Sequence, residues 1–130
     1  MAEKRPSLDQ WLEQARENPE AESCGMFLFH NGTVRVTAKA KVRFGAGDTP
    51  PVRGMLFSYD AYRVEQARQE ALRMPGIRYA RVWLNQGELR VGDDIMLVLI
   101  GGDIRPHVVD ALNMLVGKIK SECVEERELY

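Results

Sequence analysis

The chain has 130 residues, of which 45% are hydrophobic and 28% are charged. This composition is typical of one globular domain spanning residues 1–130 and excludes disordered and fibrous chains. Lys plus Arg total 18 and Asp plus Glu total 19, so the formal net charge of −1 lacks the overall basicity of a nucleic-acid-binding domain. The longest apolar stretch, residues 95–100, is too short to cross a membrane, and no signal peptide is evident. We therefore expect a cytoplasmic protein.

The first half of the chain predicts a helix followed by strands. Ser7 and Gln10 have capping-box spacing, and apolar residues follow at helical spacing up to Asn18-Pro19, so residues 1–19 are expected to form a helical arm. Residues 24–30 form a compact apolar run and predict a strand. The alternation of apolar residues from Val34 to Val42 predicts a further strand. Residues 44–54, rich in Gly and Pro, predict a loop that is either a mobile lid or a connector.

The second half alternates between strands and helices. Residues 54–59 predict a strand, Asp60 can cap a helix that ends before Pro75-Gly76, and residues 77–86 and 95–100 predict two more strands with turns at Gly87 and Gly92-Asp93. A last helix has Pro106 in its first turn and an apolar stripe consisting of Val108, Leu112, Leu115 and Ile119. The order predicts an α+β fold, a two-layer sandwich of mixed or antiparallel sheet with helices on one side.

Three groups of residues could carry chemistry. The second face of the alternating strand holds Arg35, Thr37, Lys39, Lys41 and Arg43, which indicates either an anion-binding strip or a solvated sheet face. The glycine turn before Arg105 could bind an anion at the start of the last helix, or Asp103 could simply cap that helix. Lys120 flanks the apolar stripe, so it is either a reactive amine at an apolar edge or a solvated side chain near the helix end.

Cysteine and histidine do not predict a metal site or a nucleophile. Cys24 and Cys123 lie too far apart for a CxxC motif, and we expect both to be free thiols that act as small buried hydrophobic residues. His30 and His107 have no carboxylate or thiolate at a recognisable ligand spacing. We therefore expect no metal and no cofactor.

The sequence resembles the large, catalytic subunit of molybdopterin synthase over roughly residues 24–127. The likeness rests on four segments that share the order and spacing of the family: Phe27 to Arg35, Leu56 to Tyr62 with its Tyr59-Asp60-Ala61-Tyr62, Gly87-Glu88-Leu89-Arg90-Val91-Gly92-Asp93, and Ile95 through Arg105 to Lys120. Each segment is a weak motif alone, and their common order makes the resemblance specific.

The resemblance implies an α/β hammerhead fold, a homodimer or heterotetramer, and a ubiquitin-like small partner subunit with a Gly-Gly C-terminus. It also implies sulfur transfer from the thiocarboxylate of that subunit to cyclic pyranopterin monophosphate, which forms the dithiolene of molybdopterin in molybdenum cofactor biosynthesis. By the same resemblance, Lys120 matches the essential catalytic lysine, and Arg35 and Arg105 match arginines that bind the substrate. Lys39 and Arg127 would add charge for the same anionic substrate.

The sequence departs from the family pattern at several of these positions. Ile104 stands where the family has a histidine before Arg105, Leu84-Asn85 replaces a common His-Arg pair, and the Pro-x-Trp-Lys signature has become Val124-Glu125-Glu126-Arg127. These changes keep open an alternative, namely a non-catalytic relative that binds a ubiquitin-like tail or a pterin as partner or regulator. A third alternative is an unrelated sandwich domain whose basic strand contacts RNA.

Overall fold

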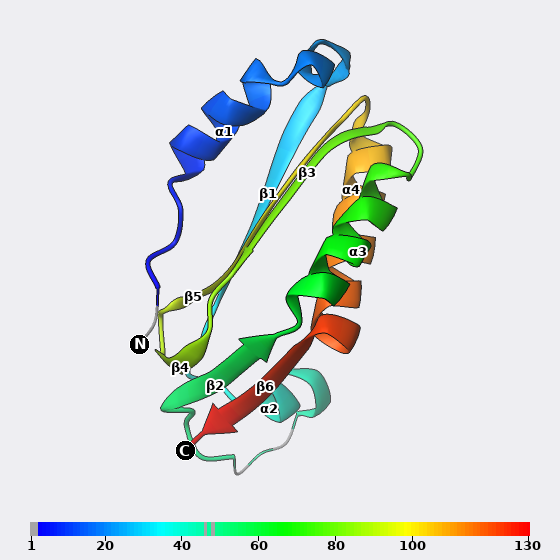
Figure 1. The fold of residues 1–130 in the computed structure, drawn as a ribbon. Coiled ribbons are helices and arrows are strands. Elements are labelled where there is room, and N and C mark those ends of the chain that lie inside the picture. The colour runs from blue at the N-terminus through cyan, green and yellow to red at the C-terminus, as the bar shows by residue number, and fades with distance from the viewer. Residues whose placement is uncertain (1–2, 46, 48) are drawn as a thin grey trace.

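Two antiparallel sheets of three strands form the frame of the molecule. The structure is a computed structural model that describes residues 3–45, 47 and 49–130. The larger sheet has the strand order β1-β5-β3 and the smaller sheet the order β4-β2-β6 (Figure 1). These strands are β1 (Met26–Thr33), β2 (Gly54–Tyr59), β3 (Ile77–Leu84), β4 (Gly87–Arg90), β5 (Asp94–Gly102) and β6 (Val124–Leu129). Every pairing described between them is antiparallel, which confirms the predicted α+β class.

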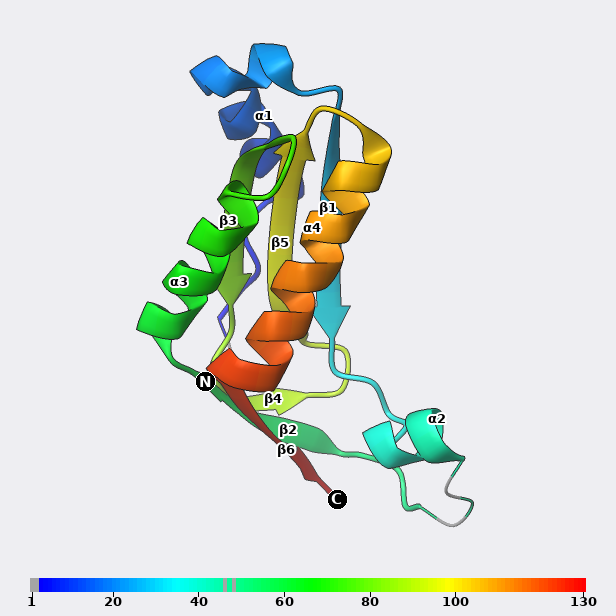
Figure 2. The same ribbon diagram turned by 90° about the vertical axis from the view of Figure 1, so that its right-hand side faces the viewer.

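Helices cover both faces of the larger sheet (Figures 1 and 2). The helices are α1 (Leu8–Glu17), α2 (Lys39–Phe44), α3 (Ala61–Leu72) and α4 (Arg105–Lys118), with a 3-10 turn at Pro19–Ser23 and a π-helical turn, η2, at Ile119–Cys123. The helices that cover the larger sheet are α1 on one face and α3 and α4 on the other, whereas α2 lies beside the smaller sheet. Met96, Val98 and Ile100 of β5 pack in the core shared with α3 and α4, whereas Leu97 and Leu99 pack with α1. The expectation of helices on one side is therefore wrong for α1, because a strand that is apolar on both faces needs cover on both.

Several predicted boundaries are confirmed at the level of single hydrogen bonds. The Ser7 side chain accepts a hydrogen bond from the backbone N–H of Gln10, and Asp60 accepts one from the backbone N–H of Arg63, so both predicted caps start their helices. The strand predicted over residues 54–59 is β2. Pro106 lies in the first turn of α4, as expected.

The predicted basic strand is wrong. Residues 34–38 have no regular structure, and residues 39–44 form α2, which ends at Gly45 with a left-handed φ of 68°. Val34 and Ala38 are buried, but Val36 and Val42 are 52% and 57% exposed. The reason is topological: β1 ends its pairing with β5 at Thr33, so no neighbouring strand continues beside residues 34–42. Without a strip of cations along one sheet face, the proposed RNA-binding reading loses its basis.

Two short strands were not predicted. β4 follows the turn that was expected at Gly87, and β6 forms from the acidic end of the chain. Both pair with β2, and together they build the smaller sheet. The predicted loop 44–54 starts inside α2 and ends at the first residue of β2, and its positions 46 and 48 lie outside the described residues.

Asn85 has a structural role at the end of the larger sheet. It is 1% exposed, and its side-chain oxygen accepts hydrogen bonds from the backbone N–H groups of Glu3 and Gln86 at 2.8 and 2.9 Å. Its Nδ2 donates to the carbonyl oxygens of Glu3 and Asp94 at 3.1 and 2.8 Å. One buried amide therefore joins the N-terminal segment to the start of β5.

Replacing Asn85 by alanine is expected to lower the free energy of unfolding by about 2 kcal/mol, because buried backbone groups lose their partners. Urea unfolding followed by circular dichroism measures the loss. Replacement of the exposed neighbour Gln86 by alanine is the control and should change the stability by less than about 0.5 kcal/mol. Equal stability of the two variants would contradict the structural role of Asn85.

Candidate functional site

Lys120 lies in the π-helical turn that extends α4. The residues of α4 and η2 that are completely buried include Val108, Ala111, Leu115 and Ile119, and this stripe faces the larger sheet. On one flank of the stripe, the Lys118 Nζ donates hydrogen bonds to both carboxylate oxygens of Glu70 on α3, at 2.8 and 2.7 Å. Lys120 is exposed beside the buried Ile119. Its predicted position, flanking the apolar stripe, is confirmed.

The helical spacing places Lys120 on the flank of α4 that faces β1. Leu112, Val116 and Lys120 follow at intervals of four residues, and such residues share one side of a helix. Lys118 occupies the other flank, which contacts α3. Figure 2 shows α4 lying between α3 and β1, so the flank away from α3 is the one beside β1. π-helical turns are rare and occur frequently at functional sites, which makes the setting of this exposed amine notable.

His30 is the residue of β1 that Lys120 influences. Its Nε2 atom is buried and has no hydrogen-bond partner. Burial lowers the pKa of His30, and the positive charge of Lys120 lowers it further. The imidazole is therefore neutral near pH 7, with an unpaired nitrogen close to a lysine from the far end of the chain. Sequence reasoning missed this pair. The sequence did hold a sign of it: His30 is two residues after Leu28, so both side chains share one face of the strand, and that face is otherwise apolar.

Arg105 lies at the opposite end of α4 from Lys120. The intervening helix rises about 1.5 Å per residue, which separates the two positions by roughly 20 Å. Asp103 does not cap α4 in the usual way, because Ile104 is the N-cap residue. Instead the Asp103 carboxylate accepts a hydrogen bond from the Ile104 N–H at 2.6 Å and pairs with the His107 Nδ1 at 2.8 Å. The hydrogen bond from His107 is the main cause that lowers the pKa of Asp103.

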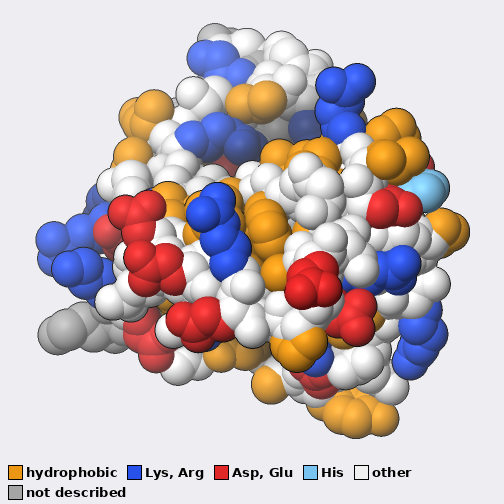
Figure 3. All heavy atoms as spheres, turned by 90° about the horizontal axis from the view of Figure 1, so that it is seen from above, with side chains coloured by type: hydrophobic (Ala, Val, Ile, Leu, Met, Phe, Trp, Pro, Cys, Tyr) orange, Lys and Arg blue, Asp and Glu red, His pale blue; other side chains and the backbone are white. Residues whose placement is uncertain are grey.

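The Asp103 carboxylate weakens the interpretation of the glycine turn as an anion-binding site. The backbone N–H of Ile104, which would have been free to bind a phosphate, is already paired with a negative group of the protein. The end of the molecule where α4 begins also carries acidic and basic side chains intermixed rather than one basic surface (Figure 3). An anion at this turn would need more than the exposed Arg105 to hold it.

The remaining predicted site residues lie around the smaller sheet. Arg35 is exposed, and its Nε donates to the Thr37 carbonyl oxygen at 3.1 Å. Lys39 begins α2, and its backbone N–H donates to the Glu128 carboxylate at 2.9 Å, which ties α2 to β6. Arg127 pairs across from Leu56 in the register of β6 and β2.

Arg127 shares a sheet face with Glu125 and Leu129, while Glu126 and Glu128 alternate to the face that carries the buried residues Met55 and Phe57. The Arg127 side chain therefore points away from the core. By contrast, one carboxylate oxygen of Glu126 is buried without a partner. The structure thus does not bring Arg105 to Lys120 within one chain.

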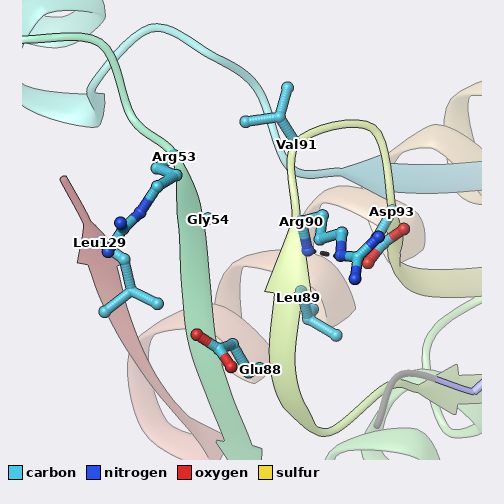
Figure 4. Close-up of a pocket in the computed structure, with 8 residues that line it drawn as sticks. All are labelled: Arg53, Gly54, Glu88, Leu89, Arg90, Val91, Asp93 and Leu129. Atoms are coloured by element: carbon cyan, nitrogen blue, oxygen red, sulfur yellow. Dashed lines mark hydrogen bonds between the residues drawn. The ribbon is translucent and has the colours of Figure 1, made fainter.

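A hollow of about 990 Å³ lies beside β4 and β2 (Figure 4). Arg53 and Arg90 both line it, but Arg53 extends toward the end of β6 while Arg90 extends toward Asp93. Asp93 also accepts a hydrogen bond from the Arg90 backbone N–H at 2.8 Å. Because the two guanidinium groups diverge and an acidic side chain lies beside one of them, this hollow is not arranged as an anion clamp.

The two cysteines and the groups that could bind a metal ion complete the search for functional residues. Both cysteines are free, as expected, and Cys123 is buried while Cys24 is partly exposed. Burial raises the pKa of the Cys123 thiol, which keeps it in the unreactive protonated form. Among the described residues, no group of three or more His, Cys, Asp or Glu side chains is placed to hold a metal ion. The same part of the chain contains no helix that is both long and apolar enough to span a bilayer.

Comparison with known proteins supports the predicted resemblance. Residues 1–122 match a family model described as MoaE protein. A molybdopterin synthase from Staphylococcus aureus has 18% identity and a TM-score of 0.69 over 91% of this chain and 83% of its own. A molybdopterin biosynthesis MoaE protein from Burkholderia ambifaria has 18% identity and a TM-score of 0.72 over 98% and 84%. A protein–protein complex of subunits 1 and 2 of molybdopterin-converting factor from Helicobacter pylori contains a chain with 14% identity and a TM-score of 0.65 over 98% and 86%.

The search among curated proteins gives no match. The structural likenesses share the two-sheet α+β architecture with this chain, and the family model covers nearly all of its sequence. The chain therefore belongs to the MoaE protein family.

Proposed function

We propose that the chain is the large subunit of a molybdopterin synthase. In this proposal it transfers sulfur from the thiocarboxylated Gly-Gly tail of a ubiquitin-like small subunit to cyclic pyranopterin monophosphate. The observation that carries the proposal is the exposed Lys120 in the π-helical turn, beside the unpaired His30 imidazole. The Helicobacter pylori complex of subunits 1 and 2 supports a small subunit as the partner.

Lys120 suits this chemistry by its charge. An ammonium group can hold the negative thiocarboxylate while its sulfur bonds to a carbon of the pterin substrate. It can also stabilise the charge on the carbonyl oxygen when water then adds to the resulting thioester, which leaves the sulfur on the pterin and releases the tail as a carboxylate. Neither a thiol of the enzyme nor a metal is needed, and this agrees with the protonated state of Cys123. Arg35 and Lys39 follow the end of β1 and provide exposed or partly exposed cations for the phosphate of the pterin.

Arg105 requires a second copy of the chain in this scheme. Because α4 separates Arg105 from Lys120 by roughly 20 Å, the two side chains serve one site only where two copies contribute to it. We propose a homodimer in which the Arg105 of one copy completes the Lys120 site of the other. The small subunits would then make the assembly a heterotetramer, with a cytoplasmic location.

A second function is favoured by a specific observation. The Asp103 carboxylate occupies the Ile104 N–H at the start of α4, and Arg127 points away from the core, so the anion-binding groups are fewer than the sequence suggested. A non-catalytic relative that binds the tail of the small subunit or a pterin would tolerate these changes. In this alternative the chain still binds its partner but does not catalyse sulfur transfer.

A reconstitution experiment separates the two functions. The purified chain is mixed with the thiocarboxylated small subunit and cyclic pyranopterin monophosphate, and molybdopterin is measured. Small subunit with an ordinary C-terminal carboxylate is the control, and calorimetry measures its binding in parallel. Product above the control supports the synthase, binding without product supports the non-catalytic relative, and the absence of both overturns the two proposals.

A further inference from the structure

We propose that His30 is a positioning residue for Lys120, with its Nε2 lone pair accepting a hydrogen bond from the Lys120 ammonium. The role of this bond in sulfur transfer rests on the proposed function, whereas the bond itself does not. His30 lies in β1, where the sequence predicted a strand.

The geometry of β1 directs His30 toward this lysine. Met26, Leu28 and His30 alternate along β1, and Met26 and Leu28 pack in the core shared with α4. His30 is therefore on the same face, at the end of the strand that leads toward Thr33. Its Nε2 lies next to Gly32, where a Cβ would sit 3.6 Å from it. The nitrogen thus points along the strand toward its end rather than across to β5.

The surroundings of His30 leave Lys120 as its charged neighbour. Across the sheet, His30 pairs with Val98 of β5. The residues on its side of β1 and β5 are apolar, namely Leu28, Gly32, Met96 and Val98. The near flank of α4 and its π-helical turn carries Leu112, Val116 and, as the one charged residue of this set, Lys120. Within the described part of the chain, Lys120 is the charge that acts on the pKa of His30.

A buried acceptor needs a donor, and Lys120 can supply one. An unpaired polar atom inside a protein is unfavourable because water cannot replace its lost hydrogen bond. The Lys120 side chain is exposed and flexible, with three N–H donors at its tip. The proposed bond needs only a rotation of this side chain that turns a donor toward Nε2. The neutral imidazole then fixes the ammonium at the place where the tail of the small subunit would enter.

The bond makes the arrangement sensitive to acid. His30 has a depressed pKa, so it is neutral above the ordinary histidine value and gains a proton only as the pH falls through its lowered value. Protonation removes the Nε2 lone pair and places two positive charges side by side. The hydrogen bond is therefore present at neutral pH and lost at low pH, together with the part of the rate that depends on it.

Nuclear magnetic resonance tests the pair directly. The chain has two histidines, so the ring spectrum of ¹⁵N-labelled protein shows His30 beside His107, which pairs with Asp103 and serves as internal reference. We expect the proton of neutral His30 on Nδ1, and we expect Lys120→Met to raise the pKa of His30. Lys118→Met, on the other flank of α4, is the matched control and should leave His30 unchanged. A proton on Nε2, or no response to Lys120→Met, overturns the proposal.

Activity tests the positioning role. His30→Phe keeps a ring of similar size but removes the acceptor, and it should lower kcat for sulfur transfer roughly 10- to 100-fold with little change in KM for the small subunit. His30→Gln restores an acceptor and should recover most of the rate. Equal rates for the two variants overturn the positioning role. Should the wild-type chain transfer no sulfur, the proposed function fails, and the resonance experiment alone decides whether the pair exists.

Discussion

Replacement of Lys120 by alanine is expected to lower the rate of molybdopterin formation by about 100-fold or more. Loss of one preorganised group that stabilises developing negative charge typically costs a factor of about 100 to 1,000 in kcat. The fold should be unaffected, because Lys120 is exposed and alanine is the residue best suited to a helix. Single-turnover formation of molybdopterin from the thiocarboxylated small subunit measures the effect on the chemical step.

Lys118→Ala is the matched control for this experiment. It removes a lysine two residues away and breaks the pair with Glu70 on α3, a surface ion pair of the kind that contributes little to stability. Its rate should stay within a factor of about two of the wild type, since the side chain lies on the flank away from β1. An unchanged product yield in Lys120→Ala would show that Lys120 is not catalytic, whatever the yield of the control.

The regular elements followed from local sequence signals, and the errors came from long-range pairing. Ser7 and Asp60 start α1 and α3 through their own side chains, so their caps could be predicted from neighbouring residues. The strand expected over residues 34–42 depended instead on a partner strand that β5 does not supply beyond Asp94. β6 was missed because its charged residues hide a strand that forms by pairing with β2.

The site was predictable in part for the same reason. The number of residues per helical turn placed Lys120 beside the buried stripe. The rise per residue, counted from Arg105, gives the distance between Arg105 and Lys120. His30 could not be assigned from sequence, because its neighbour Lys120 is brought to it by the packing of α4 against β1. Asp103 fits neither alternative that the sequence left open. It is not the N-cap of α4, and its carboxylate pairs with His107 and with the Ile104 N–H that an anion could otherwise have bound.

Replacement of Trp11 by alanine is expected to lower the free energy of unfolding by about 3 to 5 kcal/mol, the range for removal of a large buried aromatic side chain. The sequence predicted residues 1–19 as an arm, but Trp11 is 5% exposed and packs with Ala15, Leu97 and Leu99 in a core of its own. The guanidinium carbon of Arg81 lies 4.4 Å from the centre of the Trp11 ring and adds a cation–π contact. Without the indole, two leucines of the central strand become exposed to water.

Urea unfolding followed by far-ultraviolet circular dichroism measures this loss, and Glu13→Ala on the exposed side of α1 is the control, with an expected change within about 0.5 kcal/mol. A loss below about 1 kcal/mol in Trp11→Ala would mean that α1 is a loosely attached arm. The folded fraction of the variant should keep its full rate of sulfur transfer, because α1 covers the face of the larger sheet opposite to α4. A Trp11 variant that unfolds more easily yet turns over normally would show that the core under α1 stabilises the fold without contributing to the proposed site.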